Sequence, residues 1–170
     1  MKNIAIIGAG ISGLYIANLL SQNSNYQVII YEKNASVNLE KGYGIQLSVN
    51  SIKLLNQINF QKISVEDKFH PHKLDFYSLK NNKKICDLDI SMFNSTDTKY
   101  TTLQRSTLIN FLKDGLHENI IHYNKKVIKI NEEAENKEVS FEDGSSIKCD
   151  YLIISDGTFS KTKSLIANKE

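Results

Sequence analysis

The chain has 170 residues, 41% of them hydrophobic and 24% charged, so it can bury a core of ordinary size and does not have the composition of a disordered protein. Its 21 basic and 19 acidic residues leave a net charge of +2, too small and too scattered for a nucleic-acid-binding surface. The two cysteines form no C-x-x-C pair, which favours reduced thiols and no metal site.

The first thirty residues have the pattern of a β-α-β unit. Residues 4–7 form a continuous apolar run, as expected of a strand buried on both faces of a parallel sheet. Apolar residues at helical spacing predict a helix from Ile11 to about Gln22, and residues 28–31 predict a second strand. Glycines break the first run within four residues, and no segment approaches the ~18 apolar residues of a membrane span. We therefore expect a cytoplasmic protein with no secretion signal and no integral membrane segment.

The middle of the chain departs from this pattern. A glycine-containing loop and short strand at 42–47 precede a predicted helix whose apolar face carries Ile52, Leu55 and Ile58. Residues 74–79 and 84–88 alternate apolar and polar side chains around Asn81-Asn82, which predicts an antiparallel hairpin. Residues 71–101 are therefore expected to form an antiparallel excursion.

The last third returns to the α/β pattern. It predicts a helix ending near Gly115, strands at 126–131 and 139–141, a hairpin turn at Asp143-Gly144, and an apolar strand at 151–154 that runs into Asp156-Gly157 and a last short helix. We expect an α/β, Rossmann-like fold with a parallel sheet and inserted antiparallel strands. Residues 1–70 and 102–170 would form the nucleotide-binding domain, and residues 71–101 the start of a substrate-side segment.

The motif G-x-G-x-x-G, read as G-A-G-I-S-G at residues 8–13, lies between the first strand and the first helix. Gly8 permits a tight turn, Gly10 lets a pyrophosphate approach the backbone, and Gly13 lets helix and strand pack closely. The phosphate would meet the free N–H groups at the positive end of the helix dipole. The alternative is a glycine-rich turn without a ligand, which the two flanking elements disfavour.

An acidic residue follows at the spacing typical of ribose recognition. Glu32 ends the second strand, 19 residues after Gly13, where a carboxylate accepts hydrogen bonds from an adenosine ribose and repels a 2′-phosphate. Lys33 beside it could moderate that repulsion. An isolated Glu at a strand end would more simply be solvated. NAD and FAD fit these features equally.

Three further segments resemble one family of flavoproteins. They read G-Y-G-I-Q-L-S-V-N at residues 42–50, L-Q-R-S-T-L at 103–108 and D-Y-L-I-I-S-D-G-T-F-S at 150–160. Together with the glycine motif they resemble the p-hydroxybenzoate hydroxylase type of FAD-dependent aromatic monooxygenase, especially its salicylate-hydroxylase-like members, from Lys2 to about Lys163. The resemblance implies that the chain is the FAD-binding N-terminal part of such an enzyme.

The resemblance also implies a set of cofactor-binding positions. Arg105 resembles the family arginine that reaches the cofactor, although an exposed helix-start residue is the alternative. Asp156 resembles the aspartate that contacts FAD, although it could simply cap the last helix. Val127 would present its backbone to the adenine, and Gly44 lies in the loop near the isoalloxazine. The full set of implied cofactor-binding residues is Gly8, Gly10, Ser12, Gly13, Glu32, Lys33, Gly44, Arg105, Val127, Asp156 and Gly157.

The activity that the resemblance implies is hydroxylation of an aromatic or similar small substrate with NADH or NADPH and O₂. FAD would carry the chemistry, so no catalytic side chain and no metal ligand is assigned. Val49, Ser155 and Lys163 depart from the usual pattern, which weakens the nicotinamide inference more than the FAD one. The chain contains no Gly-Asp dipeptide, so we expect a fragment that is inactive alone. Alternatives are a non-catalytic nucleotide-binding remnant, another FAD-dependent oxidoreductase, and an NAD-dependent dehydrogenase. Substrate and oligomeric state stay unassigned.

Overall fold

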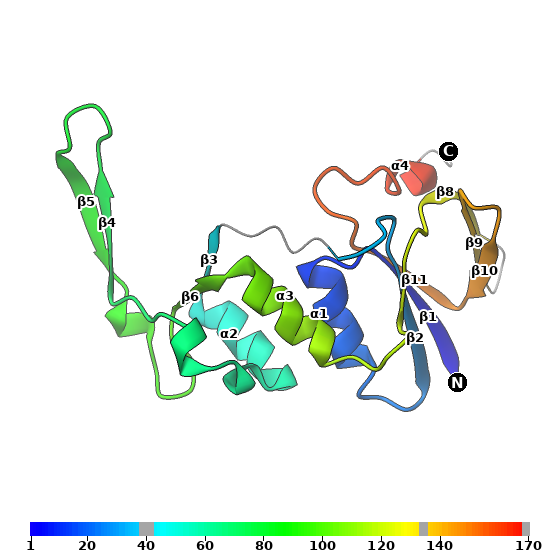
Figure 1. Ribbon diagram of the computed structural model, residues 1–170, viewed down its shortest axis with the longest axis horizontal. Helices are drawn as coiled ribbons and strands as arrows, with labels where there is room; N and C mark the ends of the chain where they lie inside the picture. Colours follow the sequence, from blue (N-terminus) through cyan, green and yellow to red (C-terminus); the bar gives the residue numbers. More distant parts are fainter. Residues whose placement is uncertain (38–42, 133–135, 168–170) are drawn as a thin grey trace. The chain divides into compact units, whose positions relative to one another are not determined.

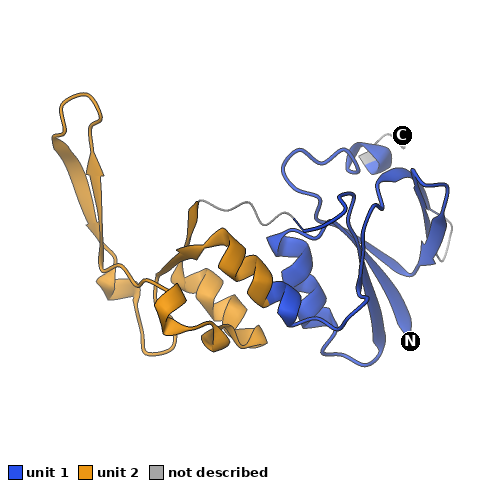
Figure 2. Cartoon of the chain, in the orientation of Figure 1, with its two compact units in different colours: residues 1–39, 112–170 blue, residues 40–111 orange. Residues whose placement is uncertain are grey.

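The computed structural model describes residues 1–37, 43–132 and 136–167 (Figure 1). The chain divides into two compact units, of which one combines residues 1–39 with 112–170 and the other holds residues 40–111 (Figure 2). The first unit contains the predicted glycine motif, and the second contains the predicted hairpin.

The first unit is built on a four-stranded parallel sheet. Its strands are β1 (Lys2–Ile7), β2 (Tyr26–Tyr31), β7 (Ile121–His122) and β11 (Tyr151–Ile154), in the order β11-β1-β2-β7. The pairs β1–β2, β1–β11 and β2–β7 are all parallel, which confirms the predicted sheet. β7 was not predicted, because two residues are too short to show a strand pattern.

Helix α1 (Ile11–Leu20) follows β1 and packs against β1 and β2 (Figure 1). Its buried residues include Leu14 and Ala17, which are three apart and therefore share one helix face. Successive residues of β1 point to opposite faces of the sheet, yet all four from Ile4 to Ile7 are buried. The sheet is therefore covered on both faces, which explains the uninterrupted apolar run.

A second sheet covers the face opposite α1. Its strands β8 (Val127–Glu132), β9 (Lys137–Phe141) and β10 (Ser146–Cys149) are antiparallel in the order β10-β9-β8. The predicted strands at 126–131 and 139–141 and the predicted hairpin at Asp143-Gly144 are confirmed. Phe141 is 1% exposed and stacks on Tyr31 of β2 with ring centroids 5.0 Å apart. Burial raises the pKa of Tyr31 above its ordinary value. The short helix α4 (Ser164–Ala167) adds Leu165 and Ile166 to the same apolar cluster.

Strands β1 and β11 come from opposite ends of the chain and are joined by a side-chain clamp. The backbone N–H of Asn3 donates to Oδ2 of Asp150 at 2.7 Å, and Nζ of Lys2 donates to Oδ1 at 2.8 Å. These donors hold the pKa of Asp150 below its usual range. The clamp fixes the register in which Ile4 pairs with Tyr151.

The second unit contains helices and two antiparallel strand pairs. Strand β3 (Gly44–Leu47) pairs with β6 (Thr101–Gln104), and between them in sequence lie α2 (Val49–Leu55) and the 3₁₀ turns η1 (Asn56–Ile58), η2 (Phe60–Lys62) and η3 (Val65–Asp67). Helix α3 (Arg105–Asp114) follows β6, and the boundary between the units falls at Leu112. The two helices predicted in this part of the chain are confirmed: Ile52, Leu55 and Ile58 are buried along α2 and η1, and α3 ends one residue before Gly115.

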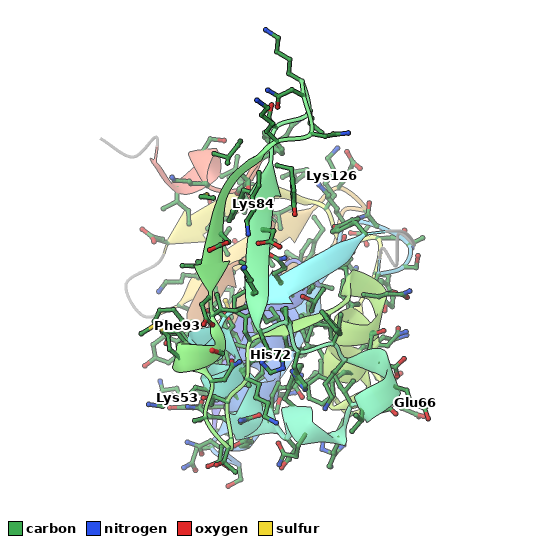
Figure 3. The ribbon with its side chains drawn as sticks, turned by 90° about the vertical axis from the view of Figure 1, so that its left-hand side faces the viewer. Lys53, Glu66, His72, Lys84, Phe93 and Lys126 are labelled. Atoms are coloured by element: carbon green, nitrogen blue, oxygen red, sulfur yellow. The ribbon has the colours of Figure 1, made fainter. Side chains whose placement is uncertain are left out.

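The predicted hairpin consists of β4 (Lys73–Tyr77) and β5 (Lys84–Asp89), and the 3₁₀ turn η4 (Ser91–Phe93) follows it. Every residue of β5 is exposed, and Figure 3 shows the hairpin with its side chains and with Lys84 labelled. Lys84 pairs with Asp75 and Asp87, and Lys73 reaches Asp87 at 3.0 Å. The predicted antiparallel hairpin is therefore confirmed, and these lysines and aspartates form an ion-pair network across its two strands.

None of the helices in the described part of the chain is both long and apolar enough to cross a membrane.

Candidate functional site

Two glycines of the motif are required by the packing of the first unit itself. Gly8 has a φ of +103°, and a Cβ added to it would lie 2.6 Å from the carbonyl oxygen of Ser155. A Cβ on Gly13 would overlap the carbonyl oxygen of Gly8. These two positions let β1, α1 and the end of β11 cross at close range.

Gly10 is different, because nothing in the described residues requires a glycine there. Its φ is −79°, an ordinary value, and a Cβ added to it would meet no described atom within 4 Å. Gly10 is the N-cap of α1 and offers no side-chain cap, so the first N–H groups of that helix lack a side-chain acceptor from the cap. The open space and the positive end of the helix dipole suit an anion such as a phosphate.

Glu32 ties the end of β2 to the glycine loop. Its carboxylate is buried, with the residue 8% exposed, and Oε2 accepts a hydrogen bond from the backbone N–H of Ala9 at 2.8 Å. Oε1 accepts from the backbone N–H of Asn34 at 2.9 Å and from its side-chain amide at 2.7 Å. A carboxylate can accept about four hydrogen bonds, so one further donor can be accommodated. The neighbouring Lys33 is exposed.

The start of β8 lies beside the Glu32 segment. The N–H of Lys125 donates to the carbonyl of Glu32 at 2.8 Å, and the N–H of Asn124 donates to the carbonyl of Asn34 at 3.1 Å. Val127, half-buried, begins β8 two residues later, next to an irregularity in its pairing with β9. The structure therefore brings Val127 to the same edge of the unit as Glu32.

Asp156 follows β11 and carries an unpaired buried atom. Its Oδ2 accepts a hydrogen bond from the N–H of Thr162 at 3.4 Å, whereas its Oδ1 is buried and has no hydrogen-bond partner among the described residues. A buried carboxylate oxygen is costly to leave unpaired, and such an atom marks a place where a ligand donor is missing. Helix α4 begins only at Ser164, so the alternative in which Asp156 caps the last helix is wrong. Asp156 closes the loop that precedes the helix.

A surface pocket of about 710 Å³ opens at the same place. It extends from Ser12 and Ile16 of α1 to the loop after β11, where Asp156 and Gly157 contribute to its wall. Gly157 has a φ of +94°, which a residue with a side chain rarely adopts. Ser12 and Asp156, predicted from distant segments, therefore line one pocket. Its complete lining is Ser12, Ile16, Ile154, Ser155, Asp156, Gly157, Thr158, Ser160, Lys163 and Ile166.

Ser155 and Asn34 belong to the site but were not predicted as functional residues. The hydroxyl of Ser155 donates to the carbonyl of Ile7 at 3.2 Å, which adds to the backbone bond between the same residues at 2.8 Å. The sequence signal for Ser155 was its departure from the usual alanine. Asn34 lies two residues after the acid at a strand end, a position from which an Asn can reach back to a neighbouring carboxylate.

Arg105 and Gly44 belong to the second unit, whereas the other predicted residues belong to the first. Arg105 begins α3, and its N–H donates to the carbonyl of Tyr43 at 3.3 Å. Its guanidinium carbon is 5.9 Å from the centroid of the Tyr43 ring, a cation–π distance. Gly44 pairs with Gln104 across β3 and β6, so the structure brings Gly44 and Arg105 together. Gly42, which the predicted loop included, lies outside the described residues.

The residues of the first unit fit an adenine dinucleotide such as FAD. The open backbone at Gly10 and the start of α1 can take a pyrophosphate, and Glu32 has one free acceptor position for a ribose hydroxyl. The unpaired Oδ1 of Asp156 can accept from a further hydroxyl. No group of three or more His, Cys, Asp or Glu in the described ranges is arranged to hold a metal ion.

The chain is similar in sequence to several known proteins. Residues 6–38 match the model of a family described as an NAD(P)-binding Rossmann-like domain. Among curated proteins, 6-hydroxynicotinate 3-monooxygenase of Pseudomonas fluorescens is 24% identical over 98% of this chain and 43% of its own length. Salicylate hydroxylase of Pseudomonas putida is 27% identical over 96% of this chain and 37% of its own length. The chain thus spans about two fifths of the length of the relatives it matches.

Solved structures share the fold. HpxO of Klebsiella pneumoniae, determined with FAD and uric acid, matches 92% of this chain and 39% of its own, with a TM-score of 0.76 and 24% identity. The 2,6-dihydroxypyridine-3-hydroxylase of Arthrobacter nicotinovorans matches 98% and 40%, with a TM-score of 0.78 and 18% identity. The chain is a relative of the FAD-dependent aromatic monooxygenases, and it fits the N-terminal, Rossmann-like part of that family.

Proposed function

We propose that the chain binds FAD and forms the nucleotide-binding part of a cytoplasmic monooxygenase that hydroxylates an aromatic substrate. In this proposal residues 1–70 and 102–170 belong to the FAD-binding domain, and residues 71–101 are the start of a substrate-side segment. The two relatives described above are named for 6-hydroxynicotinate and salicylate, both small aromatic acids, and this is the substrate class we propose. NADH or NADPH would be the reductant and O₂ the co-substrate.

The first unit supplies the adenosine and pyrophosphate contacts in this proposal. The backbone around Gly10 and the first N–H groups of α1 bind the pyrophosphate, because they are open and positively polarised. Glu32 accepts a hydrogen bond from the adenosine ribose, and the backbone at Val127 faces the adenine. The remaining contacts that we assign to this unit come from Gly8, Ser12, Gly13, Lys33, Asp156 and Gly157.

The second unit supplies two further contacts. Arg105 can bond phosphate or flavin oxygens through its planar guanidinium, and its stacking on Tyr43 restricts the directions in which it points. The backbone of Gly44 offers a close approach beside it, since a Cβ there would have no described atom nearer than 3.7 Å. Bound FAD supplies the redox chemistry, and the side chains named here bind and orient it.

The observation that carries the proposal is the buried, unpaired Oδ1 of Asp156, a residue that lines the same pocket as Ser12 of α1. A protein that only needed a stable loop would gain by pairing or removing this carboxylate oxygen. A cofactor hydroxyl gives it the missing donor. The site therefore favours a hydroxyl-bearing dinucleotide over an unliganded glycine-rich turn.

The test is a titration of the purified 170-residue chain with FAD, followed by flavin fluorescence and visible absorbance. We expect saturable binding, and roughly tenfold weaker binding for Asp156→Asn, because a neutral amide accepts a weaker hydrogen bond than a carboxylate. Asp143→Asn is the matched control, since Asp143 lies in the exposed β9–β10 turn. Absence of binding by the parent chain would contradict the proposal.

A nicotinamide dinucleotide is the second candidate ligand. It is favoured by the match of residues 6–38 to an NAD(P)-binding Rossmann-like domain. The same titration with NADH in place of FAD separates the two candidates. Tight NADH binding without FAD binding would favour a dehydrogenase-like protein over a flavoprotein.

A further inference from the structure

We infer that Asn34 is a specificity-determining residue of the dinucleotide site, which it serves by fixing the Glu32 carboxylate before the ligand arrives. The inference rests on the proposed function. Of the three hydrogen bonds that the Glu32 carboxylate accepts, two come from Asn34, one through its backbone N–H and one through its side-chain amide, and both reach Oε1. Asn34 therefore saturates the oxygen that would otherwise be free to rotate towards the ligand.

The two carboxylate oxygens of Glu32 accept hydrogen bonds from different donors. Oε1 receives both donors of Asn34 at 2.9 and 2.7 Å, whereas Oε2 receives the N–H of Ala9 alone at 2.8 Å. An ionised carboxylate only accepts hydrogen bonds, so the Asn34 side chain must present its NH₂ group to Oε1. The one remaining acceptor position lies on Oε2, beside the glycine loop. The geometry therefore directs a single ligand hydroxyl to one defined oxygen.

Asn34 is itself held in place through its backbone. Its carbonyl accepts the N–H of Asn124, and the adjoining carbonyl of Glu32 accepts the N–H of Lys125. Asn124 adopts a left-handed conformation with a φ of 57°, which turns the chain so that both N–H groups face this segment. Asn34 is exposed, yet these backbone hydrogen bonds hold its main chain, so its side-chain amide limits the rotamers open to Glu32.

A fixed carboxylate has two consequences for the ligand. Binding does not have to restrict the Glu32 side chain, which favours affinity for a free ribose. The negative charge also cannot swing away from a 2′-phosphate, which disfavours phosphorylated analogues. Asn34 is a positioning residue: it contacts no reacting atom and acts on the ligand only through Glu32.

The test is a double-mutant cycle with FAD as the ligand. Asn34→Ala should weaken FAD binding roughly five- to tenfold, because one hydrogen bond to a charged acceptor is lost while the backbone N–H of residue 34 remains. In the Glu32→Ala background the same substitution should have no effect, since its target is gone. Asn34→Ala should also reduce the ratio by which the protein binds ADP more tightly than adenosine 2′,5′-bisphosphate. A loss of stability alone would leave that ratio unchanged.

Asn131→Ala is the matched control, because the Asn131 side chain also donates to a carboxylate, that of Glu138 at 3.4 Å, within the β8–β9 pair. It should leave both FAD affinity and the ADP preference unchanged. If the parent binds FAD and Asn34→Ala binds it equally well, or loses the same factor with and without Glu32, the inference is overturned while the proposed function stands. If the parent binds neither FAD nor ADP, both fail together.

Discussion

The crossing of β1, α1 and β11 and the β4–β5 hairpin differ in how their structure is secured. At the crossing, backbone atoms meet so closely that Gly8 and Gly13 have no room for a Cβ, and the acid beside them is buried. On the hairpin, every residue of β5 is exposed, and the charges pair with one another across the strands in water. The first region depends on steric fit, and the second depends on exposed ion pairs that contribute little each.

This difference indicates which region holds the ligand site and which region tolerates substitutions. The crossing is rigid and carries the open backbone of Gly10 and the unpaired oxygen of Asp156. A site held on such elements is more accurately positioned than one held on a mobile segment. The hairpin can accept substitutions that the crossing cannot. Three experiments test this contrast.

The largest loss in the free energy of unfolding is expected from Gly13→Ala. The new Cβ would overlap the Gly8 carbonyl oxygen and approach Oγ of Ser155 to 3.1 Å, so β1 and α1 must separate. We expect a loss of about 4 kcal/mol or more in the free energy of unfolding, measured by urea denaturation. Gly10→Ala is the control, and it should cost about 1 kcal/mol or less because no described atom is near. Equal losses for both variants would show that the crossing is looser than described.

The second experiment compares the loss in the free energy of unfolding when one phenylalanine of each unit is replaced by alanine. Phe141 is 1% exposed and stacks on Tyr31, so Phe141→Ala should lower the free energy of unfolding by about 3 kcal/mol. Phe76 of the hairpin is 49% exposed, and Phe76→Ala should cost less than about 1 kcal/mol. Thermal unfolding of both variants gives the comparison. A Phe76→Ala loss as large as that of Phe141→Ala would mean that the hairpin face is buried in solution.

The smallest effect concerns the ion pairs of the hairpin. Hydrogen bonds from Lys84 hold the pKa of Asp75 and of Asp87 below the usual range. A depressed carboxyl pKa contributes stability above the unfolded value of roughly 3.9, and that contribution is lost as the pH falls through the folded pKa. Cross-strand NOEs between β4 and β5 should therefore weaken below about pH 4, while those of the parallel sheet persist. Salt at neutral pH should weaken the same NOEs slightly by screening. If the hairpin NOEs survive at low pH and high salt, backbone pairing alone is sufficient for it.

Much of the fold could be predicted from local patterns. The apolar run of residues 4–7 and the glycines after it indicate a buried strand and a helix, because each depends on neighbours in sequence. β7 could not be predicted in this way, since Ile121–His122 is a strand only through its pairing with β2. The start of α4 was also missed, because the loop from Asp156 to Thr162 is closed by a side-chain contact that leaves no periodic pattern.

The site was predicted in part for the same reason. Glu32 and the glycine motif have a spacing that any β-α-β unit imposes, and the structure brings them together through Ala9. The roles of Asn34 and Ser155 depend on contacts with groups that no periodicity identifies: a carboxylate for Asn34, and a carbonyl from the opposite end of the chain for Ser155. Arg105 was assigned by resemblance, and the structure adds its contact with Tyr43, which no local sequence pattern predicts.

The clamp between Asn3 and Asp150 also determines when the fold can form. These residues are separated by 147 positions, so strand β1 finds its partner β11 only after all the residues between them have been synthesised. Until that pairing forms, one edge of β1, whose last four residues are all apolar, stays available to other chains, which favours aggregation of the unfolded chain. Pairing over such a distance is slow, so refolding from urea should be limited by the closure of β11 onto β1.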